Sequence, residues 1–139
     1  MEIFRIIVSA VAGYLLGSIN TSLFVGRFYG VDGRKHGSGN AGLTNVYRTL
    51  GKFAALLVLA GDLLKGLLAC LAGSYIAGNL GVMAGGVAAV LGHNWPLYFG
   101  FRGGKGVLTS LAVALMMDWR IALILLGVFI AVVAITRYV

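Results

Sequence analysis

The chain has 139 residues, of which 60% are hydrophobic and 11% are charged. Soluble globular domains carry about 25% charged residues, so this composition excludes a soluble protein and predicts an all-α polytopic integral membrane protein with about five transmembrane or half-membrane helices. The net charge of +7 is concentrated in two loops, which argues against a nucleic-acid partner and favours membrane lipids and anionic substrates.

Five helices are predicted in chain order. They run from about Ile3 to Phe24, from Phe53 to Ile76, from Leu80 to Gly92, from Val107 to Met117 and from Ile121 to Ile135. We expect a loop from the first helix to Lys52, a turn at 77–79, and a helix end before Pro96, because proline lacks a backbone donor. The fourth segment is too short to cross a hydrocarbon core of about 30 Å, which predicts a half-helix.

Charge and glycine spacing add two expectations about the arrangement of these helices. With alternate loops on one face, eight of the eleven Lys and Arg residues fall on it and two, Arg5 and Arg120, fall on the other. Basic loops stay in the cytoplasm, so we expect the N terminus outside and both glycine-rich loops inside. Six glycines have the spacing of close helix contacts: Gly13 and Gly17, Gly26 and Gly30, Gly81 and Gly85.

The first polar loop has the composition of an anion site. Residues 37–42 match the G-x-G-x-x-G string, but no strand precedes them, which excludes a dinucleotide site. Glycines still allow backbone N–H groups to converge on an anion, and an arginine can add a bidentate fork. A flexible linker is the alternative. The candidate ligands are the backbone of Gly37, Gly39 and Gly42 and the side chains of Ser38, Asn40, Thr44, Asn45 and Arg48.

The second polar loop contains Gly103, Gly104, Lys105 and Gly106. It lacks the first glycine and the Ser or Thr of a phosphate-binding P-loop. Lys105 can still act as a point charge for a phosphate, and a topology anchor is the alternative.

Four polar residues lie within or at the end of the predicted spans. Asp62 and Lys65 are three residues apart, so they share a helix face, either as a mutually neutralising pair or as a substrate contact. His93 and Asn94 are next to the expected helix end, where a lone histidine is more often structural than a base. With one cysteine and two histidines in the chain, we expect no metal site. The G-x-S-x-G frame of a serine hydrolase is absent.

Taken together, these stretches resemble the bacterial PlsY family of acyl-phosphate:glycerol-3-phosphate acyltransferases. The matching residues are 36–48, 61–66, 92–99, 102–106 and 137–139. The resemblance implies acyl transfer from acyl phosphate to the 1-hydroxyl of glycerol 3-phosphate, forming lysophosphatidic acid without a cofactor. It implies that Ser38, Arg48 and Lys105 are catalytic and hold phosphate. It also implies that Lys65 lies near the site and that Asn40, Thr44, Asn45, His93 and Asn94 shape it, with Gly103 and Gly104 among the binding residues.

The resemblance carries further expectations about location and extent. It implies a multi-pass protein of the bacterial inner membrane, with its site facing the cytoplasm and the acyl-phosphate-producing enzyme as a partner. We expect residues 1–139 to form a single transmembrane acyltransferase domain. Family members continue with further helices and a third motif, so we expect the chain as written to lack these and to be inactive alone. A non-enzymatic anion carrier or phospholipid-binding protein is the alternative from another class.

Overall fold

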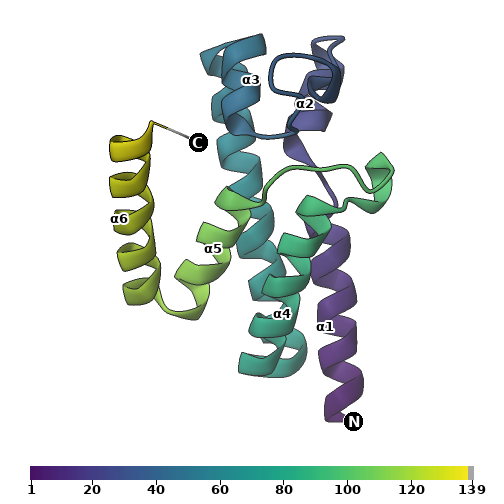
Figure 1. Cartoon of the computed structure of the whole chain (residues 1–139). Helices are drawn as coiled ribbons and strands as arrows, with labels where there is room; N and C mark the ends of the chain where they lie inside the picture. The colour runs from purple at the N-terminus through teal and green to yellow at the C-terminus, as the bar shows by residue number, and fades with distance from the viewer. Residues whose placement is uncertain (138–139) are drawn as a thin grey trace.

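The computed structural model describes residues 1–137, which form helices and loops with no strand in that range (Figure 1). Helices satisfy their backbone polar groups internally, as a lipid environment requires. The all-α fold predicted from composition is therefore confirmed. The elements are α1 (Glu2–Gly17), α2 (Thr21–Phe28), η1 (Gly33–Lys35), α3 (Leu43–Leu50), α4 (Lys52–Asn94), η2 (Leu97–Phe99), α5 (Val107–Met117) and α6 (Trp119–Thr136).

Three segments of the described chain are long and apolar enough to cross a membrane: Glu2–Phe28, Lys52–Phe99 and Trp119–Thr136. The second is long enough for two passes because α4 folds back on itself. Helix α5 has only 11 residues, as predicted for a half-helix.

A sharp bend divides α4 into two arms. Ala77 and Gly78 leave helical geometry, and the φ of Gly78 is +59°, a conformation that glycine adopts without steric cost. The two arms lie side by side beyond the bend (Figure 1), where Gly73 and Gly81 bring their backbones into contact. The predicted turn at 77–79 and the predicted helix end before Pro96 are both confirmed.

Helix α1 packs tightly against the second arm of α4 through small residues. A Cβ added at Gly13 would overlap the backbone of Gly85, and one at Gly17 would overlap the backbone of Ala89. Such close backbone approach is how helices associate in lipid without a hydrophobic driving force. The predicted packing role is wrong for Gly30, which lies beyond the end of α2 in a turn with φ +67° and open space around it.

Two local elements differ from the sequence prediction. The first predicted helix is broken between α1 and α2, because Asn20 caps α2 by accepting a hydrogen bond from the N–H of Leu23 at 3.1 Å. The long first loop contains a helix, α3, which we did not expect because its glycine-rich flanks suggested irregular structure. Its residues Leu43 and Leu50 pack against a small core that includes Val46 and Val58.

The elements are arranged with a clear polarity. The N terminus and the bend of α4 lie at one end of the molecule, whereas α2, α3 and the loop that precedes α3 lie at the other (Figure 1). The loop before α5 starts at the end of α4's second arm and approaches the same region. Both glycine-rich segments therefore lie on the opposite side of the helices from the N terminus.

Candidate functional site

The first glycine loop, residues 33–42, is organised by one amide side chain. Asn45 is 2% exposed and its Nδ2 donates to the carbonyls of Gly33, His36 and Asn40 at 2.8, 3.0 and 3.1 Å. Its Oδ1 accepts from the N–H of Ser38 at 2.9 Å. With both amide atoms engaged, Asn45 holds the shape of the loop.

The candidate ligands of this loop lie around that amide. Gly37, Ser38 and Gly39 are exposed, and Asn40, Gly42 and Thr44 are half-buried. Gly42 is the N-cap of α3, and Arg48 is exposed in the last turn of the same helix. The structure therefore presents the Ser38 hydroxyl and the Arg48 guanidinium at the surface.

The second glycine loop, residues 100–106, is anchored to the end of α4. The N–H of Gly103 donates to the carbonyl of Asn94 at 3.1 Å, and the N–H of Gly104 donates to the carbonyl of His93 at 3.2 Å. Gly106 adopts φ +71° as the N-cap of α5. Lys105 is exposed between these fixed points.

The two loops meet at two places. Gly104 lies against the carbonyl of Ala41, and a Cβ there would overlap both that oxygen and the ring of His93. Arg34 donates from its guanidinium to the carbonyl of Phe99 at 2.8 Å. The sequence does not predict this bridge, because 65 positions separate Arg34 from Phe99.

Asp32 fixes the guanidinium that makes this bridge. Nε and one terminal nitrogen of Arg34 donate to the two carboxylate oxygens of Asp32 at 3.0 and 2.9 Å. These charge-assisted hydrogen bonds lower the pKa of Asp32 from 3.8 to about 2. The carboxylate is therefore ionised at neutral pH and keeps Arg34 aimed at the second loop.

A buried ionic cluster lies beneath the second loop. Nζ of Lys65 is 2.9 Å from Oδ1 of Asp62, 2.7 Å from Nδ1 of His93 and 3.0 Å from the carbonyl of Ile19. The side chains of Asp62, Lys65 and His93 are 2%, 6% and 4% exposed. Their shared helix face, predicted for Asp62 and Lys65, is confirmed, and such burial agrees with a neutralising pair.

The structure brings together some of the predicted site residues and not others. His93, Asn94, Gly103 and Gly104 form one unit over Lys65, and Asn40 and Asn45 form another. Within residues 1–137, no recorded hydrogen bond or ion pair joins Ser38 or Arg48 to the second loop. Asp62, absent from the predicted set, belongs to the first unit.

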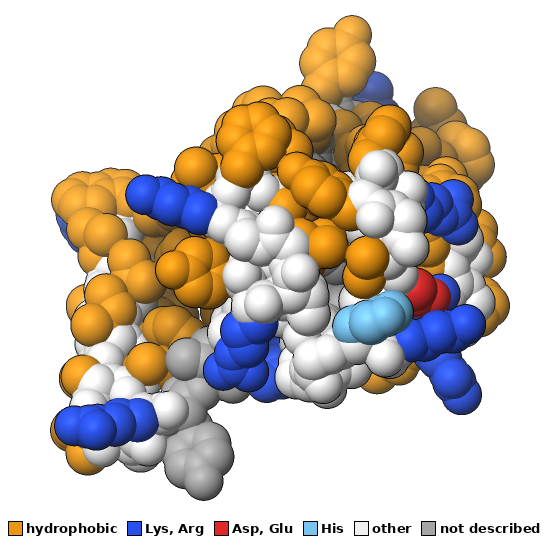
Figure 2. Space-filling model, turned by 90° about the horizontal axis from the view of Figure 1, so that it is seen from above, with side chains coloured by type: hydrophobic (Ala, Val, Ile, Leu, Met, Phe, Trp, Pro, Cys, Tyr) orange, Lys and Arg blue, Asp and Glu red, His pale blue; other side chains and the backbone are white. Residues whose placement is uncertain are grey.

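The face that carries the first loop is rich in basic side chains. Figure 2 shows several Lys and Arg side chains on it, separated by uncharged polar side chains and exposed backbone. This distribution is suited to attracting anions.

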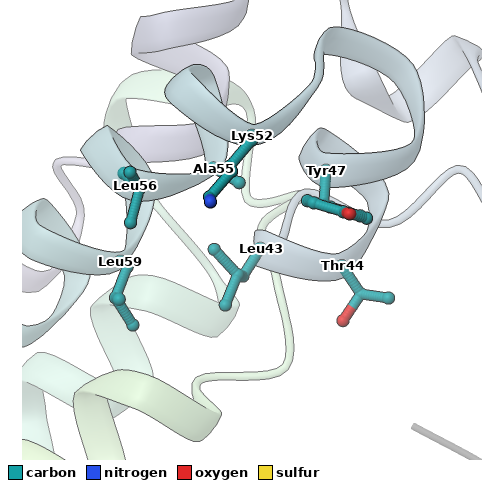
Figure 3. A pocket seen from close by; sticks show the side chains of 7 residues that line it. All are labelled: Leu43, Thr44, Tyr47, Lys52, Ala55, Leu56 and Leu59. Carbon is teal, nitrogen blue, oxygen red and sulfur yellow. The ribbon is translucent and has the colours of Figure 1, made fainter.

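Two apolar grooves lie beside the loops. One, of about 320 Å³, runs between α3 and α4, and the labelled side chains in Figure 3 include Leu43, Tyr47, Leu56 and Lys52. The other, of about 360 Å³, runs between α5 and α6 and has Lys105 among its lining residues. A groove that combines an apolar wall with a cation suits a molecule with an anionic head and an apolar tail.

The fold and this end of the molecule define a polytopic helical membrane protein with a cationic, glycine-rich surface. The family model for glycerol-3-phosphate acyltransferase matches residues 7–139. The chain belongs to the glycerol-3-phosphate acyltransferase family, as the resemblance implied.

Individual relatives agree with this family. The chain is 53% identical over 146 residues to a glycerol-3-phosphate acyltransferase of Clostridioides difficile (strain 630), covering 100% of this chain and 72% of that protein. It is 46% identical to a protein of the same name from Thermoanaerobacter sp. (strain X514), covering 96% and 68%.

A solved structure shares the fold. It is the glycerol 3-phosphate form of PlsY, described as an integral membrane glycerol 3-phosphate acyltransferase. The TM-score is 0.83 at 39% identity, with 93% of this chain and 66% of that chain covered. A lysophosphatidic acid form of PlsY aligns with a TM-score of 0.79 at 38% identity, covering 92% and 64%.

Proposed function

We propose that this chain takes part in acyl transfer from acyl phosphate to the 1-hydroxyl of glycerol 3-phosphate, with lysophosphatidic acid and phosphate as products. Family membership supports the acyltransferase reaction. The glycerol 3-phosphate and lysophosphatidic acid forms of PlsY support the acceptor and the product.

The acyl phosphate donor is what the family resemblance implies, and the groove between α5 and α6 supports a donor with an apolar chain and an anionic head. Its walls include Leu108, Leu111, Leu125 and Phe129, and Lys105 is among its lining residues. An acyl phosphate has an apolar chain and an anionic phosphate, so it matches both features. We assign the acyl chain to this groove and the phosphate to Lys105.

The reaction on such a donor needs positioning more than a protein nucleophile. The acceptor hydroxyl oxygen attacks the acyl carbon, a new C–O ester bond forms, the acyl–phosphate bond breaks, and the hydroxyl proton leaves with phosphate. Ser38, Arg48 and Lys105 are proposed to hold the phosphate groups, since preorganised cations and donors stabilise charge on the departing group. The two glycine loops supply the backbone around them, and Asn40, Thr44, Asn45, Lys65, His93 and Asn94 shape the site.

We further propose that the protein lies in the bacterial inner membrane with its N terminus outside and both loops in the cytoplasm. The charge asymmetry of the loops supports this orientation. Lys35→Cys and Arg102→Cys place thiols on exposed residues of the two loops, and the natural Cys70 is buried. An impermeant thiol reagent should label neither position from outside intact cells. Labelling of either position would contradict the proposed orientation.

The activity is tested by phosphate release in membranes that contain the protein. Release from acyl phosphate should depend on added glycerol 3-phosphate and should accompany formation of lysophosphatidic acid. Acyl-CoA should not replace acyl phosphate. An anion carrier would move phosphate or glycerol 3-phosphate across vesicles with no new ester, and that result would replace the proposal.

A further inference from the structure

The buried ammonium of Lys65 is surrounded by three acceptors. Asp62, Ile19 and His93 provide a carboxylate oxygen, a backbone oxygen and a ring nitrogen at 2.9, 3.0 and 2.7 Å. The contact with Asp62 is an ion pair, whereas the contacts with Ile19 and His93 are hydrogen bonds. The ammonium, which has three N–H donors and no acceptor, is therefore held in place by the protein itself.

The contact with His93 determines the protonation of the imidazole. Nδ1 lies 2.7 Å from Nζ of Lys65 and 3.6 Å from Oδ1 of Asp62. An ammonium can only donate, so the shorter contact requires a lone pair on Nδ1. A neutral imidazole then carries its proton on Nε2.

The proton on Nε2 lies where the two glycine loops meet. Nε2 is so close to Gly104 that a Cβ on that residue would overlap it, and the carbonyl of Ala41 lies on the same side. No hydrogen bond of Nε2 is recorded within residues 1–137, so an N–H on this atom can donate to a ligand that enters between the two loops.

We infer that Asp62 and Lys65 are positioning residues that hold His93 in the Nε2–H tautomer, and that this N–H donates to a phosphate oxygen bound between the two glycine loops. The phosphate assignment rests on the proposed function. The ring supplies a neutral, fixed donor at the phosphate, and the ionic cluster beneath it sets its orientation without touching the ligand.

The tautomer can be measured directly because the chain has two histidines. His36→Gln leaves His93 as the single imidazole, and His36 is exposed and outside the cluster. With ¹⁵N-labelled histidine, the purified protein in detergent should show a lone-pair Nδ1 and a protonated Nε2 at neutral pH. Added inorganic phosphate or glycerol 3-phosphate should shift the Nε2–H resonances. An Nδ1–H tautomer or an imidazolium would overturn the positioning role.

A double variant tests the role of the ionic pair. Asp62→Asn with Lys65→Met removes both charges together, so no unpaired buried charge remains. The Nε2–H preference of His93 should then be lost, while the helical content stays the same. Retention of the same tautomer would show that Asp62 and Lys65 do not set it.

Two substitutions of His93 test the donor itself. The terminal amide of Gln reaches the position of Nε2, whereas that of Asn reaches only the position of Nδ1. H93Q should therefore bind glycerol 3-phosphate more tightly than H93N, by about 10- to 100-fold, the usual effect of a hydrogen bond to a charged group. Equal affinities would overturn the donor role.

The inference and the proposed function fail in different ways. The wrong tautomer in a protein that binds glycerol 3-phosphate contradicts the inference alone. The Nε2–H tautomer in a protein that binds neither glycerol 3-phosphate nor phosphate contradicts the proposed function and removes the donor role with it.

Discussion

The two glycine loops face the same region of the molecule but are held by different means. The first is organised from within by Asn45, whose side chain bonds to four backbone groups of the loop. The second bonds through Gly103 and Gly104 to the end of α4, directly above a buried ionic cluster.

The two loops therefore differ in how far along the chain their supporting contacts reach. The shape of the first loop depends on residues within about a dozen positions of one another. The recorded hydrogen bonds of the second loop are equally short in sequence, but His93, which accepts one of them, also contacts Lys65 on the other arm of α4, 28 positions earlier. The two halves of the proposed site should therefore respond to different substitutions.

The largest effect is expected for Asn45→Ala, which removes all four hydrogen bonds of the first loop. At about 0.5 to 1.5 kcal/mol each, their loss destabilises the loop by roughly 2 to 6 kcal/mol. Hydrogen exchange at the N–H of Ser38 should become fast, and glycerol 3-phosphate binding should weaken. Exchange at Gly103 and Gly104 should stay slow.

Asn79→Ala is the matched control, because Asn79 is an exposed amide near the bend of α4. It should leave both loops unchanged. Equal acceleration of exchange in both loops of the Asn45→Ala variant would show that they form one cooperative unit and would break the comparison.

Arg48→Ala should have the next largest effect. Loss of one charge-assisted phosphate contact costs about 1.5 to 3 kcal/mol, which corresponds to about 10- to 100-fold in affinity for glycerol 3-phosphate. Arg120→Ala, in the first turn of α6 and outside both glycine loops, should change affinity little. Arg27 is less suitable as a control because its guanidinium lies 4.9 Å from the ring centre of Phe99. Similar losses for Arg48 and Arg120 would indicate general surface charge instead of a site.

Gly104→Ala tests whether the second loop can be perturbed while the first loop stays intact. The added methyl group overlaps the carbonyl of Ala41 and the ring of His93, and overpacking of this kind costs about 1 to 3 kcal/mol. Phosphate release should fall while the Ser38 exchange rate stays unchanged. Gly127→Ala, a helical glycine with open space around it, should be neutral in the same assay.

The smallest effect concerns the bridge between the loops through Arg34. The pKa of Asp32 is lowered to about 2 from 3.8, so its carboxylate stabilises the bridge above about pH 4, and that contribution is lost as the pH falls from 4 to 2. The side chains are about one third exposed, which limits the contribution to about 1 kcal/mol or less. Arg34 Nε–H exchange should accelerate over this range, and Asp32→Asn should abolish the pH dependence.

Much of the fold could be predicted because the signals were local. Charge-free stretches indicated the spans, and Pro96 and the Ala77–Gly78–Asn79 turn indicated helix ends that the structure confirms. The break at Asn20 escaped prediction because its cap interrupts a continuous apolar run. Helix α3 escaped because its stability comes from packing on α4, which its short, glycine-flanked sequence does not reveal.

The candidate site was partly predictable for the same reason. Glycines and cations mark both loops in the sequence, amides mark the first, and family membership supports their grouping. The role of Asn45 as the centre of the first loop and the contact of Lys65 with His93 depend on residues brought together by folding. Spacing alone does not reveal contacts over 28 positions, which separate Lys65 from His93.

Because α4 bends back on itself, the contact between Lys65 and His93 depends on the number of residues in each of its two arms. Lys65 is on one arm and His93 is on the other, so each residue inserted in either arm turns the following side chains by about 100° and withdraws the imidazole from the ammonium. The non-helical residues at 77–78 are the one point between them where added length could form a longer turn. Insertions and deletions should therefore be tolerated at the bend but not in the arms. The number of residues in each arm should accordingly be under stronger selection than the identity of the residues that face the lipid.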